Sequence, residues 1–194
     1  MSASAPTRRR LDPDARRRQL IELGLRLLAR HPSAEVPIDR IAEEAGISRG
    51  LLFHYFPTKR DFHVAVVTAA AELLVDVTDP GPAPPEERLR RSLEAYVDYV
   101  TENRDLYVAL VRGAAGADEE LQRVFDRTRG RFAERALDIL GRPDAGPLLR
   151  TAVRGWLALV EETTLDAPRT GGVDRAALVD LQERVLAGVL EAAG

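Results

Sequence analysis

Apolar residues recur at spacings of three and four along almost the whole chain, and this periodicity restricts the fold to packed helices. One example is the stripe Leu20, Leu23, Leu27 and Leu28. The sequence has no sustained alternating run rich in β-branched and aromatic residues, and no Asn-Gly or Asp-Gly hairpin turn. The sequence therefore predicts an all-α protein.

Helix breakers and caps divide the chain into about nine helices. Asp12 before Pro13, Ser48, and Thr58 with Asp61 three residues later have the spacing of helix N-caps. The expected helices lie near 13–30, 37–45, 48–56, 58–77, 85–103, 104–113, 118–140, 144–166 and 174–192. A proline-rich linker follows Asp79, between the fourth and fifth expected helices. We expect a head at 1–60, including a flexible basic arm at 1–12, and a body at 61–194.

The charge is divided unevenly between these regions. The 194 residues carry a net charge of −3, yet residues 1–60 hold 12 Lys+Arg against 7 Asp+Glu, and residues 61–194 hold 16 against 24. A basic head suggests contact with a polyanion, although chance variation over a short window is the alternative. The chain has no cysteine, which excludes disulfides and thiol chemistry. The apolar run at 62–71 is too short for a membrane span, and no signal-peptide pattern follows the first arginines, so we expect a cytoplasmic protein.

A tight turn at Ala45-Gly46-Ile47-Ser48 joins two short predicted helices. Gly46 suits a left-handed backbone, and Ser48 suits the N-cap of the following helix. This arrangement is typical of a helix-turn-helix, whose second helix enters the major groove of DNA. A purely structural helical hairpin is the alternative.

The second of these helices has two different faces, which favours the DNA-binding interpretation. Its polar positions are Ser48, Arg49 and His54, and its apolar positions, expected to face the protein, are Leu51, Leu52 and Phe56. It ends in the aromatic and basic run from His54 to Arg60, whose side chains suit contacts to phosphates.

The stretch from Ile41 to Lys59, IAEEAGISRGLLFHYFPTK, resembles the signature of the TetR family of transcriptional regulators. The resemblance implies DNA contacts by Ser48, Arg49, Gly50, Phe53, His54, Tyr55 and Lys59. Arg49 would contact a guanine edge, and Lys59 would hold a phosphate. The sequence departs from the family where Phe53 replaces a common tyrosine and where Val36-Pro37 replaces hydroxyl residues. The Arg8–Arg10 run is either a DNA-contacting arm or a solvated tail.

The resemblance also implies two roles for the body. The fourth to seventh helices would enclose a small-molecule pocket, and the last two would pair with a second subunit, so that the homodimer binds a palindromic operator. The apolar faces of the eighth and ninth helices are wider than packing against one neighbouring helix of the same chain requires. This width fits a dimer, and burial inside one chain is the alternative. The pocket candidates, which are also ordinary core candidates, are Tyr96, Tyr99, Tyr107, Phe125, Phe132 and Trp156.

Catalytic motifs are missing from the sequence. It has no nucleophile elbow, no glycine-rich phosphate loop and no paired-histidine metal spacing. We therefore expect a protein that is not an enzyme and holds no metal or cofactor. With the helix-turn-helix motif and the charge division, the resemblance implies a repressor that is released from DNA by a small molecule. A helical ligand or protein sensor that does not bind DNA, or an activator, is the alternative.

Overall fold

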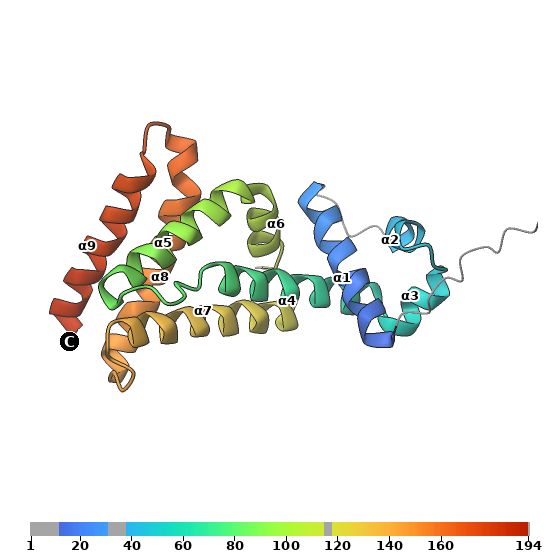
Figure 1. Cartoon of the computed structure of the whole chain (residues 1–194), viewed down its shortest axis with the longest axis horizontal. Coiled ribbons are helices and arrows are strands. Elements are labelled where there is room, and N and C mark those ends of the chain that lie inside the picture. Colours follow the sequence, from blue (N-terminus) through green and yellow to red (C-terminus); the bar gives the residue numbers. More distant parts are fainter. Residues whose placement is uncertain (1–11, 31–37, 115–117, 194) are drawn as a thin grey trace, which may run out of the picture. The chain divides into compact units, whose positions relative to one another are not determined.

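The computed structural model describes residues 12–30, 38–114 and 118–193, and these ranges contain nine α-helices and no strand (Figure 1). The prediction of an all-α fold is confirmed. The helices are α1 (Pro13–Arg30), α2 (Ile38–Glu44), α3 (Arg49–Tyr55), α4 (Lys59–Val77), α5 (Pro85–Glu102), α6 (Arg104–Ala114), α7 (Glu119–Ile139), α8 (Pro147–Thr170) and α9 (Arg175–Ala193). None of the helices in the described ranges is long and apolar enough to cross a membrane. The chain forms two compact units, divided within α4 between Val66 and Val67.

The turn between α2 and α3 in the first unit has the backbone geometry that its sequence predicts. Gly46 has a φ of 63°, in the left-handed region where a side chain is disfavoured. The N–H of Ile47 donates to the carbonyl of Ala42 at 2.9 Å, and the N–H of Gly46 donates to that of Glu43 at 2.9 Å. These two hydrogen bonds form a Schellman motif, which ends α2 and redirects the chain into α3.

A close contact between α1 and α4 contributes to the core of the first unit. The expected stripe of α1 is buried, with Leu20 and Leu27 at 0% and 1% exposure. Gly24 lies in the same face, and a Cβ placed on it would come within 2.6 Å of Val66 Cγ2 and 2.9 Å of Phe62 Cζ. The absence of a side chain at Gly24 therefore allows α4 to pack directly on α1.

The start of α4 is fixed by a reciprocal cap. The N–H of Thr58 donates to Asp61 Oδ2 at 2.9 Å, and the N–H of Asp61 donates to Thr58 Oγ1 at 3.0 Å. The predicted capping box with Asp in the place of Glu is confirmed.

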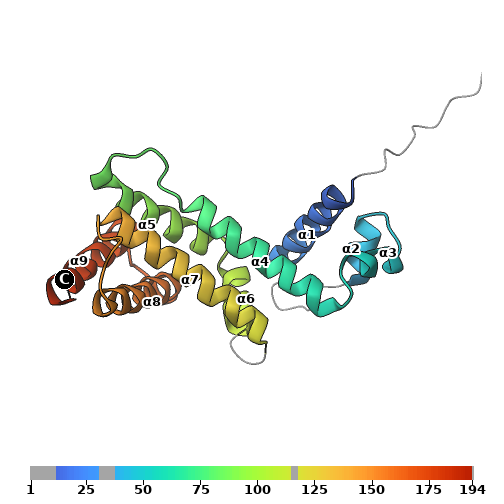
Figure 2. The same cartoon turned by 90° about the horizontal axis from the view of Figure 1, so that it is seen from below.

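The second unit contains α5 to α9 and the rest of α4 (Figure 2). Its larger apolar cluster joins α5, α7, α8 and α9, and a smaller one joins Leu74 of α4 to Val100 and Leu165. Helix α8 contacts α7 on one side and α9 on the other, and α5 contacts all three. The apolar face of α8 is buried within this unit, because four of its residues are at most 4% exposed: Leu149, Val153, Trp156 and Val160. For this face the structure matches the alternative of burial inside one chain, and not a dimer surface.

The predicted limits of the eighth helix, near 144–166, were wrong at both ends. The helix begins at Pro147, where a proline fits the first helical position, and it continues through Pro168 to Thr170. A proline costs a helix one backbone hydrogen bond and a steric clash, so an end before Pro168 was expected. Here Pro168 lies within the last turn, and the helix stops at Gly171, whose φ is 68°.

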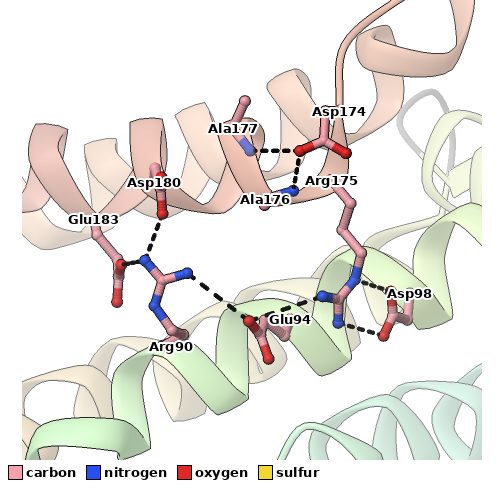
Figure 3. A network of polar contacts seen from close by, with 9 residues as sticks. All are labelled: Arg90, Glu94, Asp98, Asp174, Arg175, Ala176, Ala177, Asp180 and Glu183. Carbon is pink, nitrogen blue, oxygen red and sulfur yellow. Dashed lines mark hydrogen bonds and ion pairs between the residues drawn. The ribbon is translucent and has the colours of Figure 1, made fainter.

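A network of ion pairs on the surface joins α9 to α5 (Figure 3). Arg90 on α5 pairs with Asp180 and, at 2.6 Å, with Glu183 on α9. Arg175 at the start of α9 pairs with Asp98 on α5 through both of its carboxylate oxygens. The hydrogen bond from Arg90 lowers the pKa of Asp180 below its ordinary value. This network fixes which face of α9 is turned toward α5.

Candidate nucleic-acid interface and ligand cavity

Helix α3 is anchored to the first unit by a small number of apolar side chains. Leu52 is fully buried, and Phe56 directly after the helix is 1% exposed. Phe56 packs edge to face against Phe62 at 4.9 Å between ring centroids, and the Arg17 guanidinium lies 5.0 Å from its ring centroid. Leu51 was expected to face the protein, and this was wrong: it is 40% exposed, because Leu52 and Phe56 are four residues apart and define the buried face without it.

The opposite face of α3 presents the predicted contact residues to solvent. Ser48 caps the helix, with its Oγ accepting a hydrogen bond from the N–H of Leu51 at 3.2 Å. Gly50 is exposed, and a Cβ placed on it would meet no other atom closer than Ser48 Oγ at 3.9 Å. His54 is exposed as well. These positions leave open space along the first turn of the helix.

Arg49 is held by a partner that the sequence did not suggest. Its Nε lies 3.1 Å from Oδ1 of Asp39 on α2, while 62% of the Arg49 side chain remains accessible. Its guanidinium lies 6.0 Å from the centre of the Phe53 ring, which is half-buried. The pair holds the guanidinium beside the turn, and a ligand anion that approaches Arg49 also approaches Asp39.

The remaining candidates lie at the end of α3 and the start of α4. His54 and Tyr55 contact each other edge to face at 5.6 Å between ring centroids, with Tyr55 half-buried. Lys59 is exposed and is the first residue of α4. The predicted DNA contacts thus lie within twelve consecutive residues, on and around α3. The Arg8–Arg10 arm and Val36-Pro37 lie outside the described residues.

A cavity in the second unit is lined by all six aromatic residues that the sequence analysis named: Tyr96, Tyr99, Tyr107, Phe125, Phe132 and Trp156. The Phe132 ring packs edge to face on Tyr96 at 6.1 Å between ring centroids. Aliphatic side chains of α4, α5, α6, α7 and α8 form most of the remaining wall. The cavity has the mainly apolar lining with a few polar groups that is typical of small-molecule sites.

A chain of hydrogen bonds crosses the wall of this cavity. Tyr107 donates to Glu161 Oε1 at 3.1 Å and accepts from the hydroxyl of Tyr96 at 2.9 Å, because its single proton is used by the carboxylate. Arg129 pairs with Glu161 Oε2 at 2.8 Å. Burial raises the pKa of Tyr96 and of Tyr107 above the ordinary value for tyrosine, so both hydroxyls stay protonated at neutral pH.

Glu161, Arg129 and Ser92 at this cavity were missed by sequence reasoning. Arg131 and Arg154, two other arginines of this unit, are exposed and do not line the cavity. The only available signal for Glu161 was its position one turn after Leu157, a neighbour of the apolar stripe of α8. In the described ranges, no group of three or more His, Cys, Asp or Glu side chains could hold a metal ion.

Two family models match the chain. The model described as "Bacterial regulatory proteins, tetR family" matches residues 20–66. The model described as "Tetracyclin repressor-like, C-terminal domain" matches residues 85–188, which is more than half of the chain.

Among curated proteins, the chain is similar to the HTH-type transcriptional regulator EthR of Mycolicibacterium smegmatis, with 32% identity over 91 residues. That match covers 43% of this chain and 40% of the relative. Among solved structures, a tetR-family transcriptional regulator from Streptomyces coelicolor is 31% identical with a TM-score of 0.76, covering 94% of this chain and 83% of the other. A putative transcriptional regulator from Pseudomonas aeruginosa is 26% identical with a TM-score of 0.71, covering 94% and 93%.

Proposed function

Because the chain belongs to the TetR family of bacterial transcriptional regulators, with a DNA-binding helix-turn-helix, we propose that it is a homodimeric repressor. It leaves a palindromic operator when a small molecule occupies the cavity of the second unit. We assign DNA binding to residues 1–60 and ligand binding and dimerisation to residues 61–194.

The observation that carries the DNA-binding assignment is the two-sided environment of α3. Leu52 is fully buried and fixes the helix, while Arg49 keeps 62% of its side chain accessible in the first turn. An α-helix in the major groove contacts bases with its first residues, and an arginine there can donate two hydrogen bonds to a guanine. Lys59, at the start of the next helix, supplies a phosphate contact that does not depend on sequence.

The ligand response is supported by the position of the cavity among α4 to α8. Val67, Ala70, Ala71 and Leu74 line it, and they lie on the part of α4 that follows the helix-turn-helix unit in the chain. A ligand that fits the cavity better in one arrangement of these helices shifts the population toward that arrangement. Since α4 continues into the DNA-binding unit, this shift couples ligand binding to DNA binding.

The dimer is supported by a second, outward stripe on each of the last two helices. Exposed residues at spacings of three and four form these stripes: Leu148, Thr151, Gly155, Ala158 and Glu162 on α8, and Ala177, Leu181, Arg184, Gly188 and Glu191 on α9. A Cβ on either glycine would meet no atom of the described residues outside its own helical turn within 4 Å. Without a side chain at Gly155 and Gly188, a partner helix has room for close approach, as an isologous interface provides.

A footprint of the purified protein on genomic DNA, including the fragment upstream of its own gene, tests this function. We expect protected inverted repeats whose half-site centres are about 34–36 Å apart along the DNA. A reporter driven by a protected promoter should then be silenced by the protein. Increased transcription would identify an activator instead, and the absence of any protected site would contradict the proposal.

A further inference from the structure

The charged groups on the cavity wall are already neutralised by the protein. Among the described residues that line the cavity, only Arg129, Arg135 and Glu161 carry charges. Arg129 and Glu161 pair with each other at 2.8 Å, and Glu161 has only 15% of its side chain exposed. A cavity whose charges cancel has no counter-ion to offer to a charged ligand.

Arg135 also has partners within the protein. It donates to the carbonyl of Val75 at 2.9 Å and to Thr78 Oγ1 at 3.1 Å, and it lies 3.5 Å from a carboxylate oxygen of Asp79. A ligand carboxylate that bound at the two terminal nitrogens of this guanidinium would replace contacts that hold the end of α4. An anionic ligand would therefore be buried without a strong partner. A cationic ligand would be as well, because Glu161 already pairs with Arg129 and accepts a hydrogen bond from Tyr107.

One polar group on the wall is left without a partner. The hydroxyl oxygen of Ser92 is buried and makes no hydrogen bond to any part of the chain that the structure describes. A buried hydroxyl without a partner is costly, which makes Ser92 a site for one hydrogen bond from a ligand. Ser92 lies one turn before Tyr96 on the face of α5 that lines the cavity.

The cavity follows α5 over most of its length. Its wall includes Leu89 near the start of the helix and Asn103 at its C-cap, a separation of about 20 Å at about 1.5 Å per residue. Between these ends the side chains that line it are mainly aliphatic and aromatic. This shape suits an extended ligand.

We propose that the cavity binds an uncharged, extended and mainly apolar molecule whose one hydroxyl or carbonyl group hydrogen-bonds to Ser92. This inference rests on the proposed function only in treating the cavity as the effector site, and it adds the chemical class of the effector. The protein discriminates against ionised analogues of the same length, because their charge loses water without gaining a counter-ion.

Trp156 provides a direct readout, because it is the only tryptophan of the chain and lines the cavity. Its fluorescence is titrated at pH 7 with three eight-carbon probes: 1-octanol, octanoate and octylammonium. We expect 1-octanol to bind at least about tenfold more tightly than either ion. This ratio is a conservative expectation, because burying an unpaired charge costs more free energy than a tenfold change in affinity represents. Equal or tighter binding of an ion, or no binding of 1-octanol, would overturn the proposal.

Two variants test the assigned atoms. Ser92→Ala should weaken 1-octanol binding by about two- to tenfold, the usual value of one hydrogen bond, whereas Thr101→Ala at an exposed position of α5 should not change it. Glu161→Gln leaves Arg129 without its carboxylate, so octanoate should bind several-fold more tightly than it binds the unmodified protein. Unchanged 1-octanol affinity in Ser92→Ala would remove Ser92 from the ligand site.

Operator release is measured with the same probes, so that the two proposals fail separately. If only octanoate both binds and releases the operator, the proposed function holds and the neutral-ligand inference is wrong. If 1-octanol binds with the expected preference and the protein protects no DNA, the inference about the cavity holds and the proposed function is wrong.

Discussion

Arg49 of α3 and Asp39 of α2 form an ion pair across the helix-turn-helix, with 3.1 Å between Nε and Oδ1. Both side chains are largely exposed, at 62% and 74%, so the pair adds little to the stability of the fold. The ion pair matters for DNA binding. The Asp39 carboxylate already pairs with the guanidinium that we expect to contact a guanine, and its negative charge would lie near the phosphates of bound DNA.

Replacing Asp39 should therefore strengthen binding to DNA of any sequence. In Asp39→Asn the Arg49 side chain is released and one repulsion is removed, so we expect nonspecific affinity to rise several-fold at low salt. Fluorescence anisotropy with a random duplex measures the effect, and thermal unfolding should be almost unchanged. Nonspecific affinity equal to that of the unmodified protein would show that Asp39 does not restrain Arg49.

Gly24→Ala tests the packing of α1 on α4. The added methyl group would lie 2.6 Å from Val66 Cγ2, so we expect a loss of about 1–3 kcal/mol in the free energy of unfolding despite the better helix propensity of alanine. Denaturant unfolding measures this loss. Gly130→Ala on α7 is the matched control, because its Cβ would meet nothing within 4 Å, and it should be neutral or stabilising. Addition of Val66→Ala to Gly24→Ala should restore part of the loss.

Gly188→Leu tests the proposed dimer surface. The site is open within one protomer, so the variant should fold, whereas a partner helix packed there would clash with the new side chain. Light scattering coupled to size exclusion should show a shift from dimer to monomer. Gly130→Leu serves as the control and should remain dimeric. A Gly188→Leu dimer as tight as the original would place the interface elsewhere.

The ion pair between Arg90 and Asp180 predicts a pH-dependent contribution to stability. The pKa of Asp180 is lowered in the folded protein, so the pair stabilises above the unfolded carboxyl pKa of about 3.9, and this stabilisation is lost as the pH falls through the lower folded value. Asp180→Asn should thus lower the melting temperature at pH 7. The two melting curves should converge toward pH 3. A difference in melting temperature that stays constant between pH 7 and pH 3 would argue against ionisation of Asp180 as its cause.

Features fixed by local chemistry were predictable from the sequence. The positive φ of Gly46, the cap by Ser48 and the Thr58–Asp61 box depend only on residues a few positions apart. The buried stripes of α1 and α8 follow from helical periodicity in the same way.

Features that depend on tertiary packing were not predictable. The six aromatic residues could be named but not distinguished from core, because α5, α6, α7 and α8 bring them together. The contacts of Glu161 with Tyr107 and Arg129 join helices far apart in sequence, and the pairing of Asp39 with Arg49 depends on the angle between two helices. The continuation of α8 past Pro168 overrides a local signal that normally ends a helix.

The role of Arg49 is tested most directly by comparing Arg49→Ala with Lys59→Ala on the protected operator and on a scrambled duplex over a range of salt concentrations. We expect Arg49→Ala to lose about 1–3 kcal/mol per half-site on the operator alone, and so to lose sequence preference. Lys59→Ala should weaken binding to both duplexes and reduce the slope of log affinity against log salt concentration by about one unit. Arg131→Ala on the exposed face of α7 is the control. If Arg49→Ala keeps the full preference for the operator, α3 does not contact bases through Arg49 and the assignment is contradicted.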